Sequence, residues 1–174
     1  MIRKVASWLL FGSFSVMSTI EFHVFEPESP SYSRAIKDVQ KFLDYNYPVQ
    51  LPSIAPFHTS KHERQNLVIL TAEYSQRIIG ASAMILHEAN KVHICALAVA
   101  EDMQRIGVGT EILKRIAIMY PTHEVTLSIT MDETHLLNFY CGKEYARLTE
   151  INTDIGIIVL SLIQLNLLRD VPLP

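Results

Sequence analysis

The chain has 174 residues, a usual length for one domain and enough to bury a sizeable core. A formal net charge of −3 argues against nucleic-acid binding, which would need a clustered basic face. Two cysteines, Cys95 and Cys141, are too few for a disulfide framework and favour a reducing, cytoplasmic compartment. The seven histidines are scattered without metal-ligand spacing, so no metal site is expected.

The first sixteen residues differ from the rest of the chain. Arg3 and Lys4 precede a mostly apolar stretch, and no acidic residue occurs before Glu21, which is typical of a targeting leader. The stretch is shorter than the about 20 apolar residues that span a bilayer. An extension upstream of a start at Met17 explains residues 1–16 equally well, and both alternatives stay open. The folded domain is expected over residues 17–174.

Apolar periodicity predicts a strand over 19–25 and a helix that ends near Tyr45. The Pro-, Ser- and His-rich segment that follows, up to Gln65, is either a functional loop or a plain connector. Short turns separate the next three apolar runs and predict an antiparallel meander, with strands at 67–74, 78–86 and 92–99.

The second half of the chain continues the alternation of strands and helices. A helical face from Ile112 to Tyr120 stops at Pro121, and 125–131 alternates as a strand. Asp132 is expected to cap a further helix, and residues 146–163 to complete the sheet. The apolar segment at 155–165 predicts a core strand first and a partner-binding surface second.

Between the strand at 92–99 and the next helix lies a loop with two glycines, Gly107 and Gly109. Glycines let the backbone approach an anion, and unpaired N–H groups at a helix N-terminus attract it. The spacing lacks the Lys-Ser/Thr pair of nucleoside-triphosphate loops and the third glycine of dinucleotide loops. A turn that merely joins strand and helix is the alternative.

The loop resembles the Gln/Arg-x-x-Gly-x-Gly/Ala motif of the GNAT superfamily of N-acetyltransferases, and Phe139-Tyr140 is similar to that family's second motif. The resemblance implies an α/β (α+β) fold whose mixed, mostly antiparallel sheet is splayed between its fourth and fifth strands, with helices on both faces. It also implies that acetyl-CoA is bound by the strand residues Leu97, Ala98 and Val99 and by the loop residues Gln104, Arg105, Ile106, Gly107, Val108, Gly109 and Thr110. Tyr140 would protonate the leaving thiolate; a plain core aromatic is the alternative.

Within the superfamily, the chain resembles NatE-type N-terminal acetyltransferases, which act on Met-hydrophobic N termini. Tyr47, Pro48 and Val49 correspond to the loop that receives the first side chain of the substrate. His93 and Ser128 occupy the positions of that family's base system. An imidazole with a reference pKa near 6.5 suits a base, and Ser128 would hold a water; a non-catalytic histidine is the alternative. Alternation places His93 on one strand face with Cys95, Leu97 and Val99.

Several residues depart from the pattern of the family, among them Gln50 and Leu51 after the Pro-Val pair and two glutamates near the last predicted helix. Glu133 takes the place of an asparagine that contacts the cofactor, and Glu144 takes the place of a glycine, so the turn there is expected to use Gly142 instead. Two other functions stay open: acetylation of lysine or a small amine, and a diverged, weakly active domain that serves as a binding subunit. A direct transfer without a covalent enzyme intermediate is expected, with a possible auxiliary protein subunit and no membrane span.

Overall fold

The computed structural model describes residues 20–46 and 66–164. The leader or extension at 1–16 and the acceptor residues Tyr47, Pro48 and Val49 lie outside the described residues. In chain order the elements are β1 (Glu21–Phe25), α1 (Tyr32–Asn46), β2 (Leu67–Tyr74), β3 (Arg77–His87), β4 (Lys91–Val99), a 3-10 turn (Glu101–Met103), α3 (Val108–Met119), β5 (Glu124–Thr130), a second 3-10 turn (Met131–Glu133), α4 (His135–Tyr140), β6 (Ala146–Asn152) and β7 (Ile157–Leu162).

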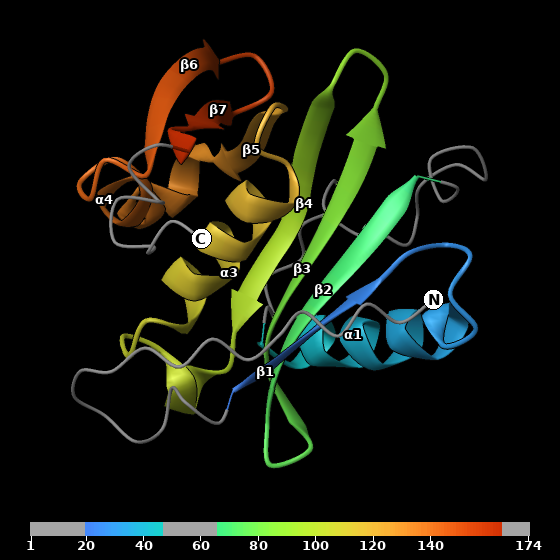
Figure 1. Ribbon diagram of the computed structural model, residues 1–174. Coiled ribbons are helices and arrows are strands. Elements are labelled where there is room, and N and C mark those ends of the chain that lie inside the picture. The colour runs from blue at the N-terminus through green and yellow to red at the C-terminus, as the bar shows by residue number, and fades with distance from the viewer. Residues whose placement is uncertain (1–19, 47–65, 165–174) are drawn as a thin grey trace.

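The described strands form one seven-stranded sheet in the order β1-β2-β3-β4-β5-β7-β6 (Figure 1). Every neighbouring pair is antiparallel except β4 and β5, which are parallel. A parallel pair needs a crossover, and α3 provides it. The mixed, mostly antiparallel sheet predicted above is confirmed.

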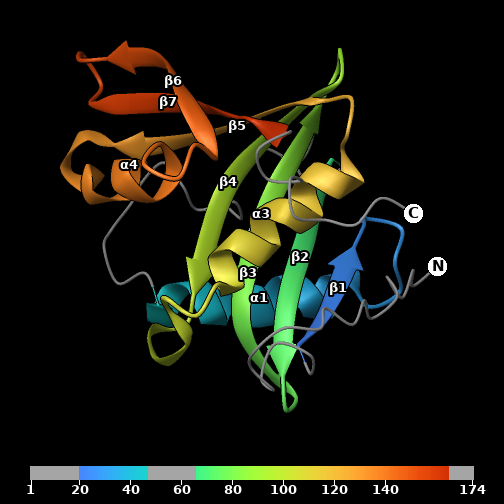
Figure 2. The ribbon, with the colours of Figure 1, turned by 60° about the vertical axis from the view of Figure 1, so that its left-hand side comes forward.

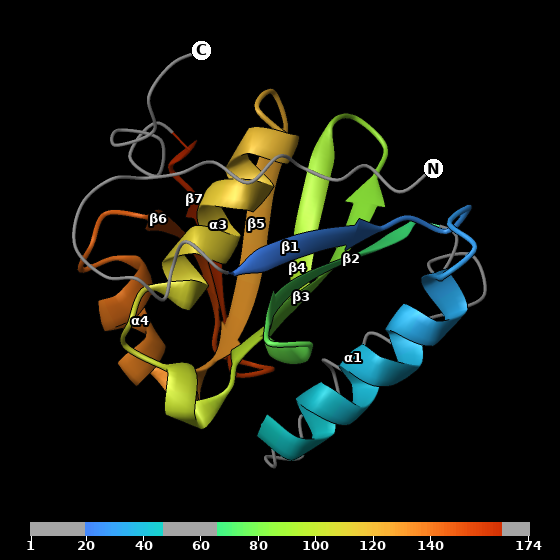
Figure 3. The same ribbon diagram turned by 60° about the horizontal axis from the view of Figure 1, so that its bottom comes forward.

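Helices cover both faces of this sheet, so the core has two parts (Figure 3). On one face the apolar side of α1, with Val39 and Leu43, packs on β2 and β3. On the other face α3 buries Ile112, Leu113 and Ile116 with the residues of α4 against the centre of the sheet. Both helices have the 3.6-residue apolar period that predicted them.

Gly80 on β3 lets α3 approach the sheet closely. A Cβ at this position would lie 2.8 Å from Ile112 Cδ1 and 3.0 Å from Val108 Cγ1. Both contacts are with the first half of α3, and glycine therefore sets the distance at which the N-terminal end of the helix lies over β3 and β4.

The segment after β5 differs from the prediction. The strand ends at Thr130 rather than Met131, and Asp132 does not cap α4. Thr130 and Glu133 instead form a capping box around the 3-10 turn: the Glu133 carboxylate accepts from the Thr130 N–H at 3.1 Å and from its hydroxyl at 2.8 Å. The carboxylate that replaces the family's asparagine therefore binds the backbone of its own turn.

The turn after α4 is also built differently from the prediction. Glu144 itself adopts the left-handed conformation, with φ of 56°, whereas Gly142 has no positive φ. Glu144 thus adopts a conformation that glycine accepts without strain, at the position where the resemblance expects a glycine. Gly142 is needed for a different reason, because a Cβ there would lie 2.5 Å from the carbonyl oxygen of Asn138.

We expect Gly142→Ala to lower the free energy of unfolding by about 1–3 kcal/mol, since the added methyl group forces the end of α4 to shift. Urea unfolding followed by circular dichroism measures this. Gly109→Ala is the control for stability, because its Cβ would make only ordinary contacts, at 3.5 Å with Phe139 Cζ and 3.6 Å with Val99 Cγ2. Equal stabilities of the two variants would contradict the steric argument.

Candidate functional site

The central feature of the site is the point where β4 and β5 part. Only four residue pairs join the two strands, from Lys91–Glu124 to Ile94–Leu127. Beyond them β4 continues to Val99 and β5 to Thr130 along diverging paths (Figure 2). Within the described part of the chain, no strand pairs with this edge of β4 after Ile94, so its N–H and C=O groups can bind an extended ligand.

A β-bulge at Cys95 accompanies this divergence. Ala83 of β3 pairs with Ala96 while Met84 pairs with Ile94, which leaves Cys95 as an extra residue in β4. A bulge bends its strand and reverses the alternation of side chains beyond it. The splay between the fourth and fifth strands therefore has a local structural cause.

The bulge corrects one prediction. Cys95, Ala96 and Ala98 contact the core on the α1 side, whereas Leu97 and Val99 pack on the α3 side. Strict alternation predicted that His93 shares a strand face with Leu97 and Val99. That prediction is wrong. The extra residue at the bulge shifts the two later residues to the opposite face.

The loop after β4 has the geometry of an anion site. Arg105 and Gly107 both have left-handed backbones, with φ of 64° and 100°. Gly107 is the N-cap of α3 and gives it no side-chain cap, so the first N–H groups of the helix, from Val108 to Thr110, have no capping side chain. Together with the helix dipole, these groups attract an anion such as a pyrophosphate.

The remaining loop residues hold this geometry in place. Gln104 donates from its side-chain amide to the carbonyl of Val99 at 3.2 Å, which ties the loop to the end of β4. Asp102, in the 3-10 turn after β4, forms a two-bond ion pair with Arg77 of β3 at 2.7 and 2.9 Å, and the hydrogen bond from Arg77 holds the pKa of Asp102 below its usual value. Ile106 is half exposed at the tip.

His93 lies at the other end of the splay, one pair before the strands separate. Its Nδ1 is 3.1 Å from the Thr126 hydroxyl on β5. Burial, and secondarily the positive charge of His87, lowers the pKa of His93 below 6.5. The ring is therefore neutral at neutral pH, as a base must be. Thr126 was not among the predicted site residues, although alternation along β5 placed it on the polar face.

Ser128 is two residues farther along β5, on the same face as Thr126 and beyond the last pair with β4. Its neighbour across the sheet is Val159 of β7. The structure thus places Ser128 beside the opening and joins His93 to Thr126 instead. The two predicted residues share a face, but among the described residues no hydrogen bond connects them.

Tyr140 is buried on the α3 side, with 5% of its surface exposed. Its ring packs edge-to-face on Phe139, with centroids 4.9 Å apart, and Phe139 lies beside Gly109 of the loop. α4 thus connects the tyrosine to the anion site through one aromatic contact. Because it is buried, Tyr140 is part of the core. Its role as a proton donor stays a prediction.

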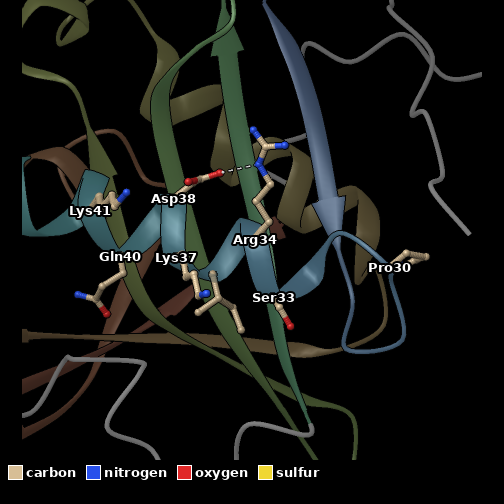
Figure 4. Close-up of a pocket in the computed structure, with 8 residues that line it drawn as sticks. Pro30, Ser33, Arg34, Lys37, Asp38, Gln40 and Lys41 are labelled. Carbon is tan, nitrogen blue, oxygen red and sulfur yellow. Dashed lines mark ion pairs between the residues drawn. The ribbon is translucent and has the colours of Figure 1, made fainter.

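A hollow lies away from this site, on the surface of α1 (Figure 4). It is lined by Pro30 and seven α1 residues, among them Arg34 and Asp38, whose side chains form an ion pair at 3.5 Å. None of these residues comes from β4, β5 or α3. Its charged lining is that of a solvated helix surface, and it contributes nothing to the site described above.

The described residues contain neither a metal centre nor a membrane-spanning helix. In 20–46 and 66–164, no group of three or more His, Cys, Asp or Glu side chains is arranged to hold a metal ion. Over the same residues, no helix has the length and apolar content needed to cross a membrane.

Comparisons with known proteins agree with this geometry. The model of the acetyltransferase (GNAT) family matches residues 25–143. No curated protein matches the chain. A solved GNAT acetyltransferase from Elizabethkingia anophelis, with acetyl-CoA bound, is 19% identical at a TM-score of 0.57, with 83% of this chain and 97% of that chain covered.

Two other solved structures show the same fold. A Bacillus subtilis acetyltransferase in complex with CoA is 15% identical at a TM-score of 0.54, with 82% of this chain and 97% of that chain covered. The ribosomal-protein-S18-alanine N-acetyltransferase of Escherichia coli is 10% identical at a TM-score of 0.57, with 81% and 92% covered. At these identities the likeness concerns the fold alone.

Proposed function

Because the chain belongs to the acetyltransferase (GNAT) family, we propose that it acetylates the α-amines of protein N termini. The observation that carries this proposal is the position of His93, a neutral imidazole at the point where β4 and β5 part. The acceptors proposed from the resemblance begin with Met and a hydrophobic residue. Proteins with such N termini are made in the cytoplasm, where we place the enzyme.

The described residues fit acetyl-CoA, the acetyl donor of this family, which presents an activated thioester to the acceptor. The edge of β4 beyond its pairing with β5, with Leu97, Ala98 and Val99, would bind the pantetheine arm through backbone groups other than the Val99 carbonyl, which accepts from Gln104. The N–H groups at the start of α3 would bind the pyrophosphate, since Gly107 brings them close without a capping side chain. Holding donor and acceptor together supplies a large part of the rate.

His93 would take the first proton from the acceptor. An α-ammonium group must become an amine before it can attack the thioester, and His93 accepts that proton directly or through a water held by Ser128. The attacking nitrogen loses a second proton as the amide forms. Tyr140 would give its hydroxyl proton to the leaving thiolate and regain one afterwards, so that one proton is released overall.

The two acceptor classes differ in how readily their ammonium group gives a proton to His93. The α-amino group titrates near 7.7–8.0 and lysine near 10.4. Burial holds the pKa of His93 below both values, so the transfer is uphill in each case, and the α-ammonium is the more acidic donor by more than two units. Proton transfer from an α-amine is therefore much less uphill, which supports the N-terminal acceptor against lysine.

One observation supports a second function, that of a partner-binding subunit. Leu148, Ile151 and Ile155 of the β6–β7 hairpin expose 47, 51 and 66% of their surface. β7 itself is core, with Leu160 fully buried, so the exposed apolar side chains of this hairpin lie on β6 and in the β6–β7 turn. An auxiliary subunit that binds this hairpin is compatible with a fully active enzyme. It is equally compatible with a weakly active domain whose main role is to bind a partner.

Mass spectrometry of acetylated peptides tests the proposed function. The full chain is incubated with acetyl-CoA and peptides that begin Met-Leu, Met-Lys or Ser-Glu, together with a small polyamine. We expect transfer to the Met-Leu peptide at the highest kcat/KM. Transfer to the polyamine alone would make the protein a small-amine enzyme, and binding of acetyl-CoA without any transfer would favour the binding subunit.

A further inference from the structure

Thr126 is the direct polar partner of the His93 ring among the described side chains. The two residues face each other in the β4–β5 register, and His93 Nδ1 lies 3.1 Å from Thr126 Oγ1. The same hydroxyl is 3.5 Å from the carbonyl oxygen of Val92, at the outer limit of a hydrogen bond. A hydroxyl group can donate one hydrogen bond and accept others, so it can connect the ring to the backbone.

Two arrangements of protons are compatible with these distances. If Thr126 donates to Nδ1, the ring proton is on Nε2, and the outer nitrogen has no lone pair for a substrate proton. If Nδ1–H donates to Thr126, the hydroxyl donates to the Val92 carbonyl and Nε2 keeps its lone pair. In the second arrangement both donors, the Nδ1–H group and the Thr126 hydroxyl, have an acceptor. Only in this arrangement can Nε2 act as a base.

We propose that Thr126 is a positioning residue that holds His93 in the Nδ1–H tautomer and so leaves Nε2 as the proton acceptor. The proposal rests on the proposed function in one respect, that His93 is the base. It adds a residue to the site and assigns the tautomer in which the site works.

As far as the described residues show, the other groups near His93 leave the tautomer to Thr126. The Cys95 thiol donates to the backbone carbonyl of His93 at 3.6 Å. Lys91 and Glu124, two pairs away along the same strands, form an ion pair at 3.4 Å. On β3, Ile85 is the direct neighbour of His93, and His87 lies two pairs farther along. α1 presents apolar residues to this side of the sheet. Across Thr126, β7 carries Ser161 and β6 carries Arg147, both farther from the ring.

The experiment combines nitrogen-15 NMR of the His93 ring with kinetics. In the wild type we expect a neutral ring protonated at Nδ1. Thr126→Val keeps the shape of the side chain without the hydroxyl, so the ring should become a mixture of tautomers. We expect kcat to fall about tenfold with both KM values unchanged, and Thr126→Ser to restore most of it.

Thr149→Val is the matched control, because the Thr149 hydroxyl also donates to a cross-strand carbonyl, that of Val159 at 3.1 Å, but on β6. It should change neither the His93 spectrum nor kcat. A wild-type ring protonated at Nε2, or a Thr126→Val variant with wild-type kcat, overturns the proposal. If the wild type acetylates no peptide, the proposed function fails, while the tautomer measurement on Thr126→Val still decides the role of Thr126.

Discussion

Replacement of His93 by Gln is expected to lower kcat for a Met-Leu peptide about a hundredfold, with little change in the affinity for acetyl-CoA. General-base catalysis contributes on the order of 10²–10⁴ to such reactions, and the amide oxygen of Gln accepts hydrogen bonds but is far too weakly basic to take the proton. His93 lies at the end of the paired part of β4, away from the loop before α3, so cofactor binding should persist. Steady-state kinetics and CoA calorimetry measure the two quantities.

The pH dependence has a definite sign. Burial lowers the pKa of His93, so the acidic limb of kcat/KM should have its midpoint below 6.5 and should disappear in His93→Gln. Between the folded pKa and 6.5 the unfolded chain binds more protons, so stability rises with pH and is lost as the pH falls through this window. His87→Gln removes a nearby charge and should keep the limb. A limb that persists without His93 would assign it to another group.

Gly107→Ala is expected to weaken CoA binding about tenfold and to lower the free energy of unfolding by about 1–2 kcal/mol. The φ of Gly107 is 100°, a conformation that costs a residue with a Cβ about this much. Relief of the strain would rotate the first N–H groups of α3 away from the anion site, where interactions with the helix terminus are worth up to about 2 kcal/mol. Calorimetric titration with CoA measures the loss.

The Gly156→Ala variant separates the loss of CoA affinity from the loss of stability. Gly156 also has a left-handed backbone, with φ of 67°, but it lies in the β6–β7 turn, where an added Cβ would meet nothing within 4 Å. We expect a similar loss of stability in thermal unfolding and an unchanged dissociation constant for CoA. Equal losses of CoA affinity in both variants would show that the effect comes from instability rather than from the loop.

The elements were predictable because their periodic patterns are long and bounded by turns. β2 begins and ends where its apolar run does, at Leu67 and Tyr74, and α3 buries the face predicted for it, including Ile112 and Ile116. The mixed sheet and the splay between its fourth and fifth strands came from the resemblance to the family and not from periodicity, and which two strands pair in parallel was not predicted. Such pairing depends on residues far apart in the chain.

The details of the site were less predictable, and each for a physical reason. The bulge at Cys95 adds one residue to one strand, which the sequence of that strand alone does not reveal. Glu144 adopts a left-handed backbone conformation, which glutamate disfavours. The prediction therefore assigned the turn to the nearby glycine, Gly142, which was wrong. Thr126 was one of several alternating polar residues until the register placed it opposite His93.

One measurement tests the proposed acceptor most directly: the position of the acetyl group on a single peptide that carries both a free α-amine and a free lysine. The peptide begins Met-Leu, is acetylated by the full chain at pH 7, and is sequenced by fragmentation mass spectrometry at low conversion. We predict that the α-amine takes nearly all of the label, because the α-ammonium group is the more acidic of the two and gives its proton to His93 more readily. Label found mainly on the lysine would contradict the assignment of an N-terminal acceptor.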